Sequence, residues 1–141
     1  MTEDQLSLLG AVIPLFPIAY FFLSSLSFFV AKFEDPVVIR VLRGLLHAYT
    51  LGLIGGSSVA ALAYAAIGRW PVAAGMALAA AAAVLARLWF LRRLDGEVAA
   101  RNGGDTSATR RLRRLHLTAI GYNAAHLVLL LASIPRIVTA H

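Results

Sequence analysis

The sequence contains no cysteine, which excludes disulfide bonds, thiolate metal sites and cysteine nucleophiles. Charge is scarce as well: charged residues make up 14% of the 141 residues, whereas hydrophobic residues make up 60%. Soluble domains carry about 25% charged residues. The composition therefore excludes a soluble globule and predicts an integral membrane protein.

Acidic residues are the scarcest charged group, with seven in the chain, and we expect all of them in loops or at the amino terminus. A proton-coupled transporter normally carries an ionisable carboxylate at membrane depth, and a catalytic histidine needs an orienting partner. The chain also has no glycine-rich phosphate loop, HExxH pair or nucleophile elbow. We therefore predict no catalytic residue and favour a protein that is not an enzyme.

What the chain does have is four long apolar stretches. They cover about residues 6–31, 37–67, 71–94 and 110–138, and each is long enough for a helix to cross a hydrocarbon core of about 30 Å. A polar loop is expected over about residues 95–109, and there is no internal repeat. We predict an all-α membrane protein in which residues 1–141 form a single four-transmembrane-helix bundle of up-down-up-down topology.

Prolines and one acidic residue mark the starts of these helices. Asp35 has the position of an N-cap and Pro36 that of the first helical residue, so the second helix should begin there. Pro71 should begin the third helix after a very short hairpin. Pro14 and Pro17 remove two backbone donors from the first span, which predicts a kink rather than a break.

Basic residues are distributed unequally between the connections. Eleven of the thirteen lysines and arginines lie in or beside the segments 32–43 and 87–114, whereas Arg69 and Arg136 lie toward the other side. Because cytoplasmic loops carry the excess of basic residues, both segments are predicted to be cytoplasmic and both termini periplasmic, in a bacterial inner membrane. The expected partner of these cations is the anionic headgroup layer of the bilayer, not a nucleic acid.

Three histidines and an asparagine are the polar residues hardest to place in apolar spans. His116, Asn123 and His126 fall within an arc of about 80° on the last helix, and His47 lies on the second helix, which should run parallel to it. Measured from the last arginine of each basic cluster, His47 lies about 6 Å into its span, His116 about 3 Å and His126 about 18 Å. The matched depths predict that His47 and His116 face each other.

Two facing histidines can hold a b-type haem as axial ligands, and Arg40, Arg43 and Arg114 would then bind its propionates. Haem b is the one cofactor that this spacing suggests, with His47 and His116 as its metal ligands. The alternative is that both histidines are interfacial polar residues bonded to carbonyls, serines or lipid phosphate.

Two further polar groups have structural interpretations. His126 lies deeper, and a hydrogen bond to Asn123, Tyr122 or Ser58 would satisfy it without any catalytic role. Arg87 lies near the end of the third span and is expected to extend its side chain toward the arginines that follow it at the membrane surface.

Two short patches carry a resemblance. Arg114-Leu115-His116 followed by Asn123, together with Leu45-Leu46-His47-Ala48-Tyr49 after a short basic turn, resembles the small four-helix membrane proteins related to transmembrane protein 205 and their bacterial relatives. The resemblance implies a four-helix membrane fold and little about mechanism.

Three function classes follow from these observations. The first is a non-enzymatic binding or accessory module that acts through the histidine- and arginine-lined face at the cytoplasmic side, with a membrane-protein partner or a second copy of itself. The second is a haem-binding electron-transfer or quinone-reacting subunit that uses His47 and His116. The third is a small exporter or channel formed by oligomerisation through the glycine and alanine faces. We favour the first.

Overall fold

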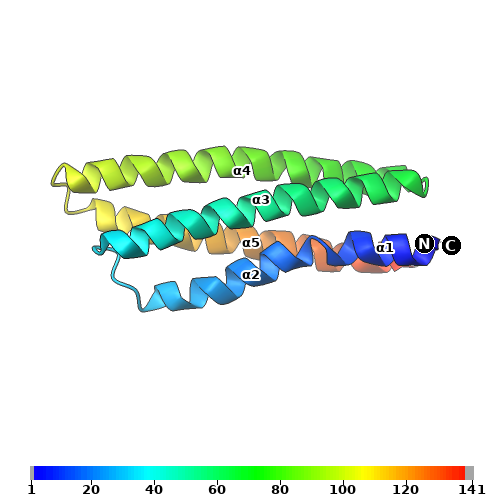
Figure 1. Ribbon diagram of the computed structural model, residues 1–141, viewed down its shortest axis with the longest axis horizontal. Coiled ribbons are helices and arrows are strands. Elements are labelled where there is room, and N and C mark those ends of the chain that lie inside the picture. Colours follow the sequence, from blue (N-terminus) through cyan, green and yellow to red (C-terminus); the bar gives the residue numbers. More distant parts are fainter. Residues whose placement is uncertain (1, 139–141) are drawn as a thin grey trace.

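The computed structural model describes residues 2–138, with side chains described as far as residue 132. All regular elements in this range are helices, in the order α1 (Glu3–Val12), α2 (Leu15–Ser25), the short 3-10 helix η1 (Leu26–Phe29), α3 (Pro36–Ala66), α4 (Trp70–Asn102) and α5 (Ala108–Val138). Figure 1 shows four long helical segments lying along one axis, the first of them made of α1, α2 and η1.

Each of the four segments is long and apolar enough to cross a membrane. This confirms the prediction of an all-helical protein with four candidate spans. The start of α1, the α3–α4 turn and the end of α5 lie at one end of the bundle, which we call the terminal end (Figure 1). The α2–α3 connection at residues 30–35 and the α4–α5 connection at residues 103–107 lie at the other, which we call the basic end.

The four segments have defined neighbours. The contacts join α3 to α1, α2 and α4, and they join α5 to the same three helices. Within the described residues α3 and α5 share no such contact, so they lie on a diagonal of the bundle. This arrangement decides which side chains of the two helices can meet.

Local signals set most helix ends as predicted. Asp35 caps α3 by accepting a hydrogen bond from the backbone N–H of Val37 at 2.8 Å, and Pro36 follows as the first helical residue. Between α1 and α2, Ile13 and Pro14 keep right-handed helical dihedral angles, so the first span bends without unfolding. The span changes direction here as predicted (Figure 1), although the helix is interrupted for the two residues between α1 and α2.

The bent first segment packs against glycines of α3. A Cβ atom added at Gly52 would lie 3.0 Å from the Cβ of Pro17, and one added at Gly56 would lie 3.2 Å from Ile13. The proline-containing part of the first segment therefore lies directly on glycine backbone of α3. Small residues allow this close approach between helices.

One predicted boundary is wrong. The loop expected over 95–109 is reduced to residues 103–107, because α4 continues to Asn102. The polar residues after Leu94 form an amphipathic helical extension, in which Glu97 is buried against α5 and Asp95 is exposed. The expectation that every acidic residue lies in a loop or at the amino terminus is therefore also wrong.

Candidate functional site: a lateral pocket and the separated histidines

His116 is enclosed by aromatic rings. Its side chain is 2% exposed, and its ring centroid lies 5.1 Å from that of Phe28, 6.1 Å from Phe33 and 6.3 Å from Phe21. Within the described residues neither ring nitrogen has a hydrogen-bond partner, although the imidazole approaches the backbone of Ser25. We call Phe21, Phe28 and Phe33 the phenyl enclosure.

His47 lies on the opposite side of α3 from this enclosure. It is exposed, and its Nδ1 atom lies 3.0 Å from Nη2 of Arg87 on α4. Tyr49, two residues further on, stacks on Phe21 of the enclosure at 4.4 Å. Because residues two apart on a helix differ by about 200°, the His47 side chain points away from His116.

The predicted pairing of His47 with His116 is therefore wrong. The second and fourth helices run parallel as expected, but α3 and α5 are diagonal and His116 turns toward α2 instead. Axial haem ligands must face each other across the iron with room for the ring between them. An enclosed imidazole and an exposed one pointing away from it do not fit that requirement, so His47 and His116 do not form a ligand pair for haem b.

The three arginines assigned to the propionates lie on two helices, Arg40 and Arg43 on α3 and Arg114 on α5. Arg43 binds both carboxylate oxygens of Asp95 on α4, at 2.9 and 3.2 Å. Arg40 and Arg114 are exposed at the basic end. Because α3 and α5 share no contact among the described residues, Arg114 does not join the two arginines of α3.

Asn123 is completely buried and joins α5 to the first segment. Its side-chain nitrogen donates to the carbonyl oxygen of Ile18 at 3.1 Å, while its side-chain oxygen has no hydrogen-bond partner among the described residues. Asn123 therefore fixes the packing of α5 against α2.

The Arg87 side chain does not extend toward the membrane surface as predicted. Its guanidinium donates to the carbonyl oxygen of His47 at 3.3 Å and to the hydroxyl of Thr50 at 3.4 Å, so it faces α3 rather than extending toward the arginines that follow it. The nearby Thr50 is buried and offers an acceptor at this depth. Sequence reasoning missed this contact because hydropathy does not show which neighbouring helix presents an acceptor.

The basic end is closed by an ion pair whose carboxylate is buried. Glu97, 7% exposed, accepts from Nε of Arg111 at 2.6 Å, and Arg111 also contacts Asp105 at 2.7 Å. The Ser107 hydroxyl and the Arg111 guanidinium both donate to Asp105 and lower its pKa below the ordinary aspartate value. These bonds join the end of α4, the connection and the start of α5. In the sequence, the signal for this ion pair was an acidic residue at position 97 followed by an arginine-rich segment.

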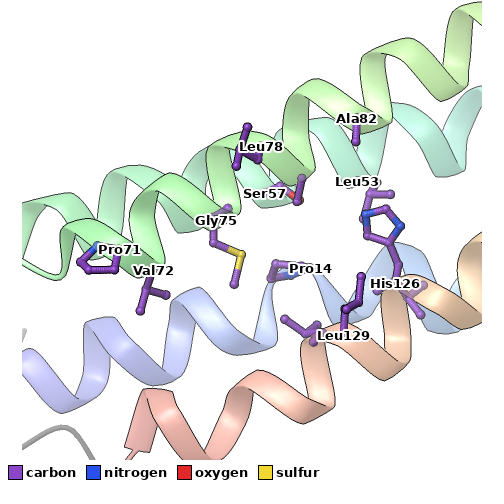
Figure 2. Close-up of a pocket in the computed structure, with 14 residues that line it drawn as sticks. Pro14, Leu53, Ser57, Pro71, Val72, Gly75, Leu78, Ala82, His126 and Leu129 are labelled. Atoms are coloured by element: carbon purple, nitrogen blue, oxygen red, sulfur yellow. The ribbon is translucent and has the colours of Figure 1, made fainter.

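A pocket of about 540 Å³ lies closer to the terminal end. Figure 2 shows α4 separated from α5 across this space, with the His126 imidazole pointing from α5 into it. We call it the lateral pocket. Its lining residues come from all four segments: Pro14, Ile18, Leu53, Ser57, Pro71, Val72, Gly75, Met76, Leu78, Ala79, Ala82, His126, Leu129 and Leu130.

The lining of the lateral pocket is apolar with two polar groups. Ser57 and His126 are the hydrogen-bonding side chains, and none of the described lining residues is charged. The His126 ring packs on the ring of Tyr122 with centroids 4.7 Å apart, but the Tyr122 hydroxyl has no hydrogen-bond partner among the described residues, so this is a ring contact and not the predicted hydrogen bond. Among the described residues no three histidine or acidic side chains gather in a way that would hold a metal ion.

Comparison with known proteins identified no relative of this chain. No protein-family model, curated protein or solved structure matches the chain. The resemblance to the proteins related to transmembrane protein 205 stays a prediction.

Proposed function

We propose that the protein is a four-span membrane protein that binds a small, uncharged, largely apolar molecule in the lateral pocket. The observation that carries the proposal is the pocket itself, whose apolar walls converge on the imidazole of His126 and the hydroxyl of Ser57. Ligand pockets have volumes of about 300 to 1,000 Å³ and combine apolar walls with a few polar groups. The lateral pocket has both properties.

The lining also limits the chemistry of the ligand. A charged head group would lose its water shell in an apolar site and needs an opposite charge to replace it. Because the described lining offers none, we expect a neutral head with a hydroxyl or carbonyl group, which His126 can meet as donor or acceptor. Long-chain alcohols and quinones from the bilayer have this chemistry.

Photolabelling in lipid nanodiscs tests this proposal. The probe is a long-chain alcohol that carries a diazirine group, and peptide mapping by mass spectrometry locates the labelled residues. We expect saturable labelling of residues 71–82 and 126–130, reduced by excess unlabelled alcohol, and much weaker labelling by the matching fatty acid. Labelling of these segments that excess alcohol does not reduce would contradict the proposal.

Two glycine variants separate pocket binding from general lipid contact. A side chain at Gly75 would extend into the pocket, and its Cβ would meet no atom within 4 Å, so Gly75→Leu should fill the site without strain. Gly121→Leu is the matched control, because Gly121 is equally open but does not line the pocket. We expect Gly75→Leu to reduce the saturable labelling at least tenfold and Gly121→Leu to leave it unchanged.

We further propose that the basic end faces the cytoplasm, in the inner membrane of a bacterium. The support is the charge distribution, with eleven of thirteen basic residues at or near this end. The absence of cysteine makes the test clean. Thr106→Cys in the α4–α5 connection should react with a membrane-impermeant maleimide only after the cytoplasmic face is exposed, whereas Thr2→Cys should react from outside.

A further inference from the structure

A second, shallower groove lies on the outer face of α4. It has a volume of about 440 Å³ and is lined by Leu85, Leu88, Trp89, Arg92 and Arg93. Their spacing of three, four, seven and eight residues places them on one face of the helix. The groove is independent of the lateral pocket, with which it shares no lining residue.

This face is unpartnered within the described part of the bundle. The opposite side of α4 buries Ala83, Phe90 and Leu94, whereas Leu85 is 68% exposed and Trp89 is 52% exposed. Apolar walls of this exposure at the side of a membrane helix face lipid or another protein.

The two arginines of the groove have few acidic partners among the described residues. Arg92 forms no ion pair with any described residue, and Arg93 reaches Glu97 at 3.5 Å. That carboxylate is already held by Arg111 at 2.6 Å. No acidic residue lines the groove, so it attracts an anion.

The order of these residues along α4 matches the depth profile of one bilayer leaflet. From Leu85 to Arg92 the helix rises about 10 Å, at about 1.5 Å per residue. Leucines therefore occupy the level of acyl chains, Trp89 the interface and the arginines the level of phosphate. A symmetric second copy would bring like charges together here, which disfavours protein self-association at this face.

We propose that this groove binds one anionic phospholipid, with its phosphate on Arg92 and Arg93 and an acyl chain along Leu85 and Leu88. Trp89 packs beside the glycerol region. The site selects anionic lipids because the phosphate of a zwitterionic lipid is already neutralised by the ammonium group of its own head group. The phosphate of an anionic lipid keeps its net negative charge, which two guanidinium groups attract.

Lipid binding to the purified full-length protein tests the assignment. The protein in mild detergent is titrated with phosphatidylglycerol or phosphatidylcholine, and bound lipid is counted by native mass spectrometry. We expect one phosphatidylglycerol to bind at least tenfold more tightly than phosphatidylcholine. Millimolar inorganic phosphate should not displace it, since free phosphate lacks the acyl chain.

Matched charge variants decide whether the groove is the site. Arg92→Gln with Arg93→Gln should weaken this binding at least tenfold, and Trp89→Leu should weaken it about threefold. Arg110→Gln with Arg114→Gln removes the same charge from exposed positions of α5 and should change it less than twofold. Thermal unfolding confirms that each variant is folded, and Arg92→Gln alone serves if the double variant is not. Equal losses of lipid affinity in both double variants would show diffuse electrostatic attraction and overturn the proposal. No loss of affinity in either variant would also overturn it, as would a changed oligomeric state of the groove variant.

Discussion

The two halves of the bundle differ in how α4 and α5 meet. Toward the basic end, Glu97 and Arg111 join the two helices, and three phenyl rings from the first segment and the α2–α3 connection close over His116. Toward the terminal end, no ion pair joins α4 to α5 among the described side chains, and the two helices part around the lateral pocket. The same pair of helices is therefore fastened at one end and open at the other.

The two histidines of α5 show what this difference does to one side-chain type. His116 is sealed among aromatic rings and has no space for a ligand, whereas His126, ten residues later, borders a pocket. An imidazole in a sealed apolar site contributes to packing, while one at a cavity wall is able to bond a guest. Changes at the closed half should therefore alter stability, and changes at the open half should alter binding.

The largest expected effect comes from the phenyl enclosure. Phe33→Ala removes a fully buried ring that contacts His116 and Phe28, and we expect it to lower the free energy of unfolding by about 3 to 5 kcal/mol. Leu78→Ala, at a pocket-lining residue that is 71% exposed, should change it by less than about 1 kcal/mol. Denaturant titration in detergent measures both. Equal losses would mean that the pocket is as tightly packed as the enclosure.

A pair of glycine-to-alanine changes makes the next comparison. An alanine Cβ at Gly10 would lie 2.8 Å from the ring of Tyr64, which cannot swing away without breaking its 2.7 Å hydrogen bond to the carbonyl of Ser7. We expect a loss of about 1 to 3 kcal/mol there. Gly75→Ala meets open space and should gain up to about 1 kcal/mol from helix propensity. Thermal unfolding of the two variants should move in opposite directions.

Local sequence chemistry accounts for the parts of this structure that were predictable. The Asp35–Pro36 start, the bend at Pro14 and the four apolar segments depend on neighbouring residues and on hydropathy, and each appears where expected. The polar extension of α4 did not follow from hydropathy, because its helix is completed by the contact of Glu97 with another helix. Composition alone cannot distinguish such an extension from a loop.

The candidate site was less predictable because it depends on the rotation of whole helices. Helical spacing correctly indicated that His116 and Asn123 share the inner face of α5, and both are buried. It could not show whether His47 or Tyr49 faces inward on α3, since that is decided by the stacking of Tyr49 on Phe21. The lateral pocket itself arises from the divergence of α4 and α5, which no sequence motif marks.

A smaller effect is expected at the ion pair that fastens the closed half. Glu97→Gln removes the negative charge from a buried side chain. If its partner Arg111 were fully buried, leaving that arginine without a counter-charge would destabilise the fold by several kcal/mol. Arg111, however, is 35% exposed and keeps Asp105, so we expect a loss of about 1 kcal/mol. Asp95→Asn, in a pair that is about half exposed on both sides, should cost less. A loss at Glu97 above about 3 kcal/mol would show that Arg111 depends on this one partner.

The smallest expected effect is a pH dependence of the protein's stability that arises from Asp105 at the basic end. The Ser107 hydroxyl and Arg111 lower the pKa of Asp105 in the folded protein, so its carboxylate stabilises the fold fully at pH values above the ordinary aspartate pKa. That contribution is lost as the pH falls through the lowered pKa of the folded state. The difference in melting temperature between the wild type and Asp105→Asn should therefore be present at pH 7 and shrink in strong acid. Because no acidic residue lines the described lateral pocket, neutral-alcohol labelling there should not differ between these two proteins at either pH.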